Sequence, residues 1–141
     1  MKIAMLGSGF IARFYATSLH AQRRKDFIYT VYSRNIENAK RFAEDYQLQH
    51  FTDDMDAAIN HHEVEVVIIS LPNHLHEMAV GACAKYKKHV LCTKPLGRTA
   101  AEAKRMLQLA EDAGIFSGYL EDLCYTPKFL KSVAGDRKSV V

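Results

Sequence analysis

The chain has 141 residues, the length of one ordinary domain, and it is 48% hydrophobic and 25% charged, which excludes a disordered or fibrous protein. Nineteen basic residues against sixteen acidic ones give a formal charge of +3, too small an excess to predict nucleic-acid binding. No apolar run approaches the ~18 residues of a membrane span. Three widely spaced cysteines, Cys83, Cys92 and Cys124, and no signal peptide predict reduced thiols in a cytoplasmic protein.

Short apolar segments alternate with segments of helical periodicity through residues 1–120. The predicted strands are 3–6, 27–32, 50–51, 64–71, 89–92 and 115–120. The predicted helices are 11–19, 36–46, a brief one capped by Asp53, 75–86, and one that runs from the capping box Thr99–Glu102 to Gly114. Strict alternation of strand and helix predicts parallel strands joined by right-handed crossovers. The expected fold class is therefore α/β, with a doubly wound parallel sheet.

The turn between the first strand and the first helix has the sequence Gly7-Ser8-Gly9-Phe10-Ile11-Ala12, which fits the G-x-G-x-x-A pattern of dinucleotide-binding loops. Gly7 permits the tight turn, Gly9 lets a pyrophosphate approach the backbone, and Ala12 lets the helix lie close to the strand. The free N–H groups of the helix then face the phosphates. We predict dinucleotide binding here, and the alternative is a purely structural turn.

The end of the second strand predicts which dinucleotide is preferred. A carboxylate at this place favours NAD because it accepts hydrogen bonds from the adenosine ribose. The sequence instead has Tyr32-Ser33-Arg34-Asn35, and the Ser33 hydroxyl followed by the Arg34 guanidinium suits a 2′-phosphate. We therefore expect NADP rather than NAD. In the alternative interpretation Ser33 and Asn35 cap the next helix and Arg34 is a surface residue.

Two further polar stretches follow the fourth and fifth predicted strands, Leu71-Pro72-Asn73-His74-Leu75-His76 and Cys92-Thr93-Lys94-Pro95-Leu96. Ligands of doubly wound folds bind at the carboxyl ends of the strands, so we expect both stretches to reach one crevice. Together with the glycine loop, these motifs resemble the N-terminal domain of the Gfo/Idh/MocA (glucose–fructose oxidoreductase and inositol dehydrogenase) family, whose members have P-N-x-x-H and K-H-V-x-x-E-K-P segments at these places. The resemblance covers about residues 1–130.

The resemblance implies a Rossmann-type oxidoreductase that uses a pyridine nucleotide and acts on a sugar, a polyol or a related alcohol or ketone. The lysine that matches Lys94 lies near the nicotinamide and the substrate in that family, where it binds the reacting oxygen or assists proton transfer. Lys94 and His76 are therefore the predicted catalytic residues; the alternatives are a surface lysine before a turn proline and a capping or surface histidine. Asn73 is also a candidate N-cap of the next helix. The predicted cofactor-binding residues are Gly7, Gly9, Phe10, Ile11, Ala12, Ser33, Arg34, Leu71, Pro72, Asn73, His76, Thr93, Lys94 and Pro95.

The sequence departs from the family pattern in two ways. Thr93 stands where the family usually has a glutamate, so a charge that could tune the lysine is missing. Full members continue into an α+β domain that holds most of the substrate pocket, whereas we expect residues 121–141 to contain only a crossover segment and a helix that starts at Thr126-Pro127. We expect a cofactor-binding half with little activity alone. The alternative is a nucleotide-sensing or protein-interaction module on the same fold.

Two partner predictions complete the sequence reading. Neither His74-Leu75-His76-Glu77 nor His61-His62-Glu63 has an established zinc spacing, so we expect no metal site. Apolar surface left uncovered next to the last strand and the helix after Thr126 predicts self-association, in the form of a homodimer.

Overall fold

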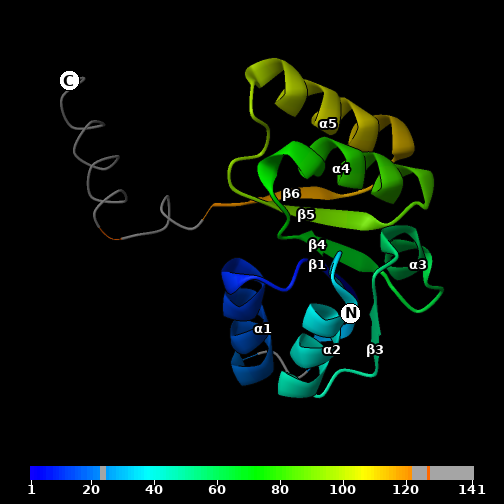
Figure 1. Cartoon of the computed structure of the whole chain (residues 1–141). Coiled ribbons are helices and arrows are strands. Elements are labelled where there is room, and N and C mark those ends of the chain that lie inside the picture. The colour runs from blue at the N-terminus through cyan, green and yellow to red at the C-terminus, as the bar shows by residue number, and fades with distance from the viewer. Residues whose placement is uncertain (23–24, 122–126, 128–141) are drawn as a thin grey trace.

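The computed structural model describes residues 1–22, 25–121 and 127. Six strands and five α-helices alternate along the described chain (Figure 1). The strands are β1 (Lys2–Leu6), β2 (Phe27–Tyr32), β3 (His50–Thr52), β4 (Val66–Ile69), β5 (His89–Thr93) and β6 (Ser117–Leu120). The helices are α1 (Phe10–Gln22), α2 (Ile36–Asp45), α3 (Met55–Asn60), α4 (His76–Lys85) and α5 (Ala100–Ala113), with one 3₁₀ turn, η1 (Asn73–Leu75), before α4.

The strands form one parallel sheet in the order β3-β2-β1-β4-β5-β6. The chain begins in the middle of the sheet at β1, builds outward to β3, and then returns past β1 to add β4, β5 and β6. The strand order therefore reverses between β1 and β4, which is the place where doubly wound folds open a crevice for a ligand. The predicted doubly wound α/β fold is confirmed.

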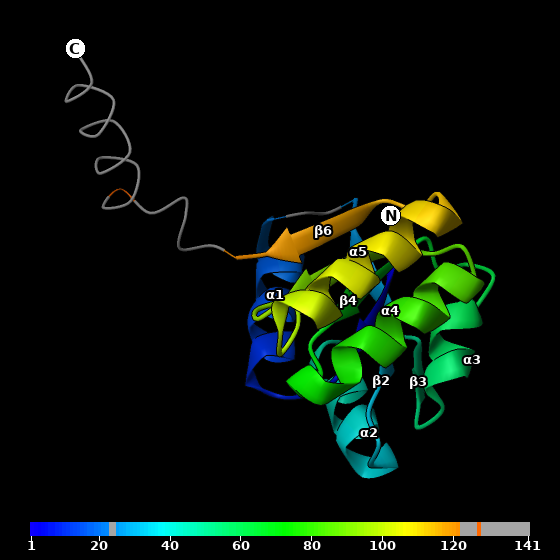
Figure 2. The same cartoon turned by 90° about the horizontal axis from the view of Figure 1, so that it is seen from above.

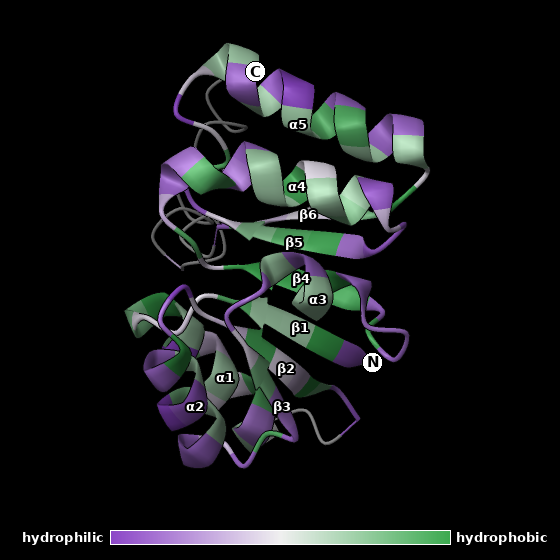
Figure 3. Ribbon diagram, turned by 45° about the vertical axis from the view of Figure 1, so that its right-hand side comes forward, coloured by the Kyte–Doolittle hydropathy of each residue, from purple (hydrophilic) through white to green (hydrophobic). Residues whose placement is uncertain are grey.

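Helices cover both faces of the sheet, and a hydrophobic core lies under each layer. On one face α1 and α2 pack against strand residues such as Met5 and Val31. On the other face α3, α4 and α5 pack against residues such as Leu6 and Val67. Met5 and Leu6 belong to different cores because successive side chains of a strand point to opposite faces. Helices α4 and α5 lie side by side in both views (Figures 1 and 2), and the central strands are coloured hydrophobic in Figure 3.

Side chains cap three helices in the described chain. The Asn35 amide oxygen accepts hydrogen bonds from two backbone N–H groups at the start of α2, at 2.9 and 3.4 Å, which confirms the capping alternative for this residue. Helix α3 begins after Asp54, whose carboxylate accepts a backbone N–H at 3.0 Å, so the prediction that Asp53 is the cap is wrong by one residue. Thr99 caps α5, as predicted, and Gly114 ends that helix with a left-handed φ of 66°.

Two predicted segments differ from the structure or lie outside it. The strand predicted at 64–71 is shorter, because only Val66–Ile69 joins the sheet and the chain bends away at Ser70 and Leu71. The predicted helix that starts at Thr126 lies outside the described residues, as does Cys124. Cys83 and Cys92 are free and buried. None of the described helices is long and apolar enough to cross a membrane.

Candidate functional site

A cleft of about 500 Å³ opens at the carboxyl ends of the central strands. Three loops form its walls: the loop between β1 and α1, the loop between β2 and α2, and the loop that follows β4. The residues that line it are Gly7, Ser8, Gly9, Phe10, Ile11, Tyr32, Ser33, Arg34, Asn35, Asn38, Ser70, Leu71, Pro72, His74 and Leu75. The glycine loop, the Ser33-Arg34 pair and the loop after β4 therefore meet at one site, as predicted.

The two glycines of the first loop have different surroundings. Gly7 is buried, has a φ of +109°, and a Cβ built on it would lie 2.4 Å from the carbonyl oxygen of Ser70. No other residue type fits this position, because both the backbone angle and the close approach exclude a side chain. A Cβ on Gly9 would meet nothing within 4 Å. Gly9 is thus free of packing constraint, and its lack of a side chain leaves space on the cleft side of the helix start.

The start of α1 lies close to the sheet because Ala12 is fully buried beneath it. This helix has 13 residues, and its first turn contains no acidic side chain. The first turn of a helix presents unpaired backbone N–H groups and the positive end of the helix dipole. The cleft is therefore suited to an anionic group at this point.

The end of β2 presents hydroxyl and guanidinium groups to the cleft. The Ser8 hydroxyl donates a hydrogen bond to the Ser33 oxygen at 3.1 Å, so the first and second loops are joined here. The Ser33 backbone N–H donates to the carbonyl oxygen of Thr52 at 3.1 Å, and Asn35 rather than Ser33 caps α2. Arg34 is exposed and lines the cleft. The described loop contains no carboxylate, and Asn38, which sequence reasoning missed, lines the cleft from the first turn of α2.

Ser70 is a second cleft residue that sequence reasoning missed. Its hydroxyl oxygen is buried, and among the described residues it has no hydrogen-bond partner. An unpaired buried hydroxyl is unfavourable, and such groups usually mark a place where another molecule binds. Ser70 lies in the wall of the cleft opposite Gly7. Only its position directly after the strand signal could have indicated this role.

The second polar stretch borders a neighbouring hollow of about 240 Å³. Its lining residues are Phe10, Ile11, Phe14, Tyr15, Thr93, Lys94 and Leu120. Phe10 and Ile11 also line the first cleft, so the two spaces adjoin across the start of α1. Lys94 is exposed at the carboxyl end of β5, whereas Thr93 is buried. The structure therefore brings Lys94 to the same edge of the sheet as the glycine loop.

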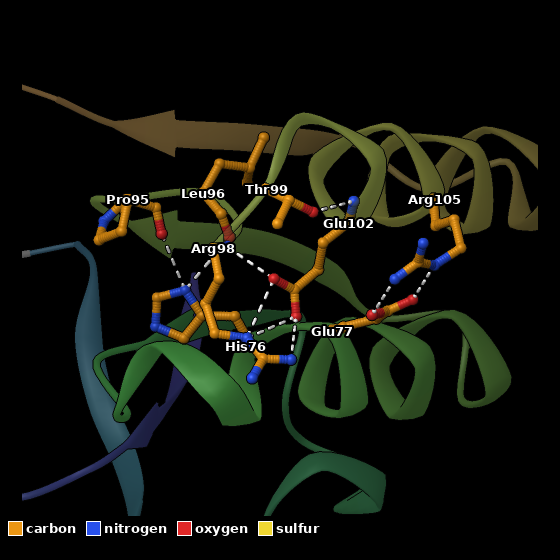
Figure 4. A network of polar contacts seen from close by, with 8 residues as sticks. All are labelled: His76, Glu77, Pro95, Leu96, Arg98, Thr99, Glu102 and Arg105. Carbon is orange, nitrogen blue, oxygen red and sulfur yellow. Dashed lines mark hydrogen bonds and ion pairs between the residues drawn. The ribbon is translucent and has the colours of Figure 1, made fainter.

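His76 is completely buried, and this burial contradicts the alternative of a capping or surface histidine. Its Nδ1 lies 3.1 Å from the carbonyl oxygen of Pro95 and 3.3 Å from that of Leu96, and its Nε2 lies 2.9 Å from the carbonyl oxygen of Leu71 (Figure 4). The ring lines neither hollow. A side chain with no exposed surface does not touch a substrate directly, so any role of His76 in catalysis is exerted through the residues that it holds.

Two other predicted site residues lie apart from the hollows. Asn73 does not cap α4, because it begins the 3₁₀ turn η1, and neither this turn nor the helix has a side-chain cap. Its backbone is committed to the turn by the bond from the Leu75 N–H to the Pro72 carbonyl at 2.9 Å. Asn73 and Pro95 are both exposed but line neither hollow. Within the described ranges, no group of three histidine, cysteine or acidic side chains is placed to hold a metal ion.

The family model described as "Oxidoreductase family, NAD-binding Rossmann fold" matches residues 1–119 of the chain. The chain belongs to the Gfo/Idh/MocA family. This Gfo/Idh/MocA chain is 36% identical over 111 residues to glucose-6-phosphate 3-dehydrogenase of Bacillus subtilis, which covers 78% of the chain and 30% of that protein. It is 30% identical over 124 residues to levoglucosan dehydrogenase of Pseudarthrobacter phenanthrenivorans, with 82% of the chain and 31% of that protein covered.

A solved structure agrees with this assignment. The crystal structure of biliverdin reductase from Synechocystis, in complex with biliverdin and NADP⁺, matches with a TM-score of 0.75 and 26% identity, over 84% of the chain and 37% of that protein. The chain spans about a third of the length of the curated relatives that it matches. The part that it shares with them is the NAD-binding Rossmann domain.

Proposed function

We propose that the cleft at the β1–β4 switch point binds a pyridine dinucleotide, with its pyrophosphate over Gly9 and the start of α1. The observation that carries this proposal is the unpaired, buried Ser70 hydroxyl facing a glycine loop that has no side chain in the way. The residues present fit the group, since backbone N–H groups, hydroxyls and one guanidinium are the donors that phosphates and ribose oxygens require. When bound, the nicotinamide supplies hydride transfer.

NADP is the dinucleotide that the end of β2 favours. Arg34 is exposed at the cleft wall, and the described loop 32–35 offers it no carboxylate partner, so its guanidinium is available to a 2′-phosphate. The Ser33 hydroxyl accepts a bond from Ser8 and keeps its own proton to donate. A charge-assisted hydrogen bond contributes about 1.5–3 kcal/mol, which corresponds to a preference of about tenfold or more over NAD. That a structural relative holds NADP⁺ agrees with this choice.

Lys94 is the residue we propose to act beside the nicotinamide, on a small alcohol or ketone of the sugar or polyol class that the relatives' names indicate. An ammonium group there stabilises negative charge on the reacting oxygen. Because Thr93 supplies no carboxylate, and because the chain spans about a third of its relatives, we expect residues 1–120 to bind cofactor and to turn over little substrate alone. Residues 121–141 would then belong to a crossover toward a substrate domain.

A non-catalytic nucleotide-sensing or interaction module is the second candidate, and Thr93 is the observation that favours it. The variant Lys94→Ala distinguishes the two, with Lys104→Ala on the exposed face of α5 as the control. Loss of turnover with retained NADPH binding supports chemistry, whereas no change in any assay supports the module. A calorimetric titration of the purified chain with NADPH tests the binding that both candidates require.

Self-association is part of the same proposal. Phe10, Phe14 and Phe116 are 82%, 53% and 63% exposed, and large apolar surfaces of this kind usually contact another protein surface. We expect a homodimer, which sedimentation velocity at several concentrations would detect. A net charge of +3 supports no nucleic-acid partner, and the two free, buried cysteines agree with a cytoplasmic location.

A further inference from the structure

The segment from residue 94 to residue 98, called here the lysine loop, determines where Lys94 lies. Lys94 itself is exposed at its first position. The rest of the loop runs across the carboxyl end of β5 to the start of α5. A long, flexible ammonium side chain can act at one place only if the backbone beneath it is fixed. The contacts that hold this loop are therefore relevant to the site.

His76 contacts the lysine loop from α4. Its Nδ1 faces two carbonyl oxygens of the loop, those of Pro95 at 3.1 Å and Leu96 at 3.3 Å. Carbonyl oxygens only accept hydrogen bonds, so each contact is favourable only when Nδ1 carries a proton. The Cys92 sulfur lies 3.3 Å from the same nitrogen, and burial raises the pKa of this thiol to about 12, so no thiolate competes for the ring.

The far end of the loop is held from α5. The buried carboxylate of Glu102 accepts the backbone N–H of Arg98 at 2.6 Å and also pairs with its guanidinium (Figure 4). A Cβ on Gly97 would lie 2.7 Å from the backbone nitrogen of Ala103, so the loop rests directly on the first turn of α5. With this end fixed by Glu102, the two carbonyls next to Lys94 are left to His76.

The same ring reaches the opposite wall of the cleft. Its Nε2 lies 2.9 Å from the carbonyl oxygen of Leu71, and Leu71 lines the dinucleotide cleft. That wall has backbone bonds of its own, from Ser70 N–H to Leu6 at 2.8 Å and from Leu75 N–H to Pro72 at 2.9 Å. The loop after β4 therefore depends on His76 less than the lysine loop does.

We propose that His76 is a positioning residue: its Nδ1–H donates to the carbonyls of Pro95 and Leu96 and so holds Lys94 beside the nicotinamide half of the bound dinucleotide. This inference rests on the proposed function. It replaces direct catalysis by His76 with an action through the lysine loop. It also assigns a division within the site, because the adenosine half is held by Ser33, Arg34 and the glycine loop, which His76 does not contact.

Two isosteric variants separate the contacts of the ring. An asparagine places an N–H close to the position of Nδ1, and a glutamine reaches toward the position of Nε2. His76→Asn therefore keeps the bond to the lysine loop, and His76→Gln keeps only the bond to Leu71. The probes are NADPH and 2′,5′-ADP, which contains the adenosine half and no nicotinamide.

We expect His76→Gln to bind NADPH about tenfold more weakly than the wild-type chain and to bind 2′,5′-ADP equally well. His76→Asn should bind both ligands within about twofold of the wild type. A purely structural role would weaken both ligands together in both variants. Equal NADPH binding by His76→Gln, or equal losses in the two variants, would overturn the proposal.

A second measurement needs no variant to fold. In the chain labelled with ¹⁵N-histidine, the ring-nitrogen chemical shifts of His76 distinguish N–H from a lone pair. A protonated Nδ1 is expected, and a lone pair at Nδ1 contradicts the proposal whatever the binding results. If wild-type chain binds neither NADPH nor 2′,5′-ADP while Nδ1 is protonated, the proposed function fails and so does the role beside nicotinamide, whereas the contact with the loop stands.

Discussion

Gly7 and Ser70 touch across the switch point of the sheet: a Cβ on Gly7 would lie 2.4 Å from the Ser70 carbonyl oxygen. The Ser70 N–H in turn donates to the carbonyl of Leu6 at 2.8 Å. The loops after β1 and β4 are thereby joined at their bases and open only above this contact. Gly9, two residues further along, has open space around its Cα. One glycine therefore serves the fold and the other leaves room for a ligand.

Alanine substitutions should separate these two roles. We expect Gly7→Ala to lower the free energy of unfolding by about 1–3 kcal/mol or more, because it combines a positive φ with a backbone clash. Gly9→Ala should change the free energy of unfolding by less than about 1 kcal/mol but weaken NADPH at least about tenfold, since the new methyl group fills the approach to the helix start. Urea unfolding and calorimetry measure the two effects. Undiminished NADPH binding by Gly9→Ala would refute this assignment of the pyrophosphate.

The preference for NADP should depend on Arg34. Replacement by alanine removes the guanidinium from the cleft wall, so we expect NADPH affinity to fall about tenfold or more and NADH affinity to change less than about twofold. Arg41→Ala, on the exposed surface of α2, is the matched control and should leave both affinities unchanged. The effect of Arg34→Ala on NADPH should also shrink at high salt, because the contact is electrostatic. A uniform loss for both dinucleotides would show that Arg34 does not read the 2′-phosphate.

Acid should destabilise the layer formed by α4 and α5. The Arg98 side chain, by hydrogen bonding, lowers the pKa of Glu102, and Arg105 does the same for Glu77. Groups with a lowered pKa in the folded state stabilise it above their ordinary pKa of 4.5 and lose that contribution as the pH falls through the folded value. We therefore expect the free energy of unfolding to decrease from about pH 5 downward.

The variant Glu102→Gln tests this origin of the acid sensitivity. It should be less stable than the wild type near neutral pH and should lose less stability between about pH 5 and pH 3, because one of the titrating groups is gone. Glu111→Gln, at an exposed position of the same helix, is the control and should follow the wild-type profile. Parallel pH profiles for Glu102→Gln and the wild type would contradict the account. Urea unfolding at a series of pH values provides the data.

The two buried thiols should be inert in the folded chain. Burial raises the pKa of Cys83 and of Cys92 to about 12, so almost no thiolate is present at neutral pH. We expect a thiol reagent to modify them only as fast as the protein unfolds, and peptide mapping by mass spectrometry identifies each site. Modification of Cys92 at the rate of a small free thiol, without unfolding, would show that the region around His76 opens readily.

Local patterns predicted the parts of the site that local patterns control. The glycine loop, the polar end of β2 and the alternation of strands and helices were readable because turn geometry and periodicity depend on neighbouring residues. Asp53 and Asp54 are chemically equal candidates for one cap, so the choice between them depended on the exact bend of the chain. The strand at 64–71 was predicted too long because Ser70 and Leu71 remain apolar enough in pattern while the chain already turns toward Pro72.

The burial of His76 was not predictable in the same way. Its partners are carbonyl groups 5, 19 and 20 residues away, and any residue type carries a backbone carbonyl, so the sequence has no signal for them. The unpaired Ser70 hydroxyl is similar, because its importance comes from the position of Gly7 on another strand. Asn38 lines the cleft only because α2 begins at the angle that Asn35 sets.

The measurement that tests the central claim most directly is a calorimetric titration of the purified chain with NADPH and, separately, with NADH. Saturable binding of NADPH at one site, about tenfold tighter than NADH, is the result that the glycine loop, Ser70 and Arg34 together predict. Abolition of that binding by Gly9→Ala would locate it in the cleft. Absence of binding for both dinucleotides by a folded chain would contradict the claim and reduce the loop to a structural turn.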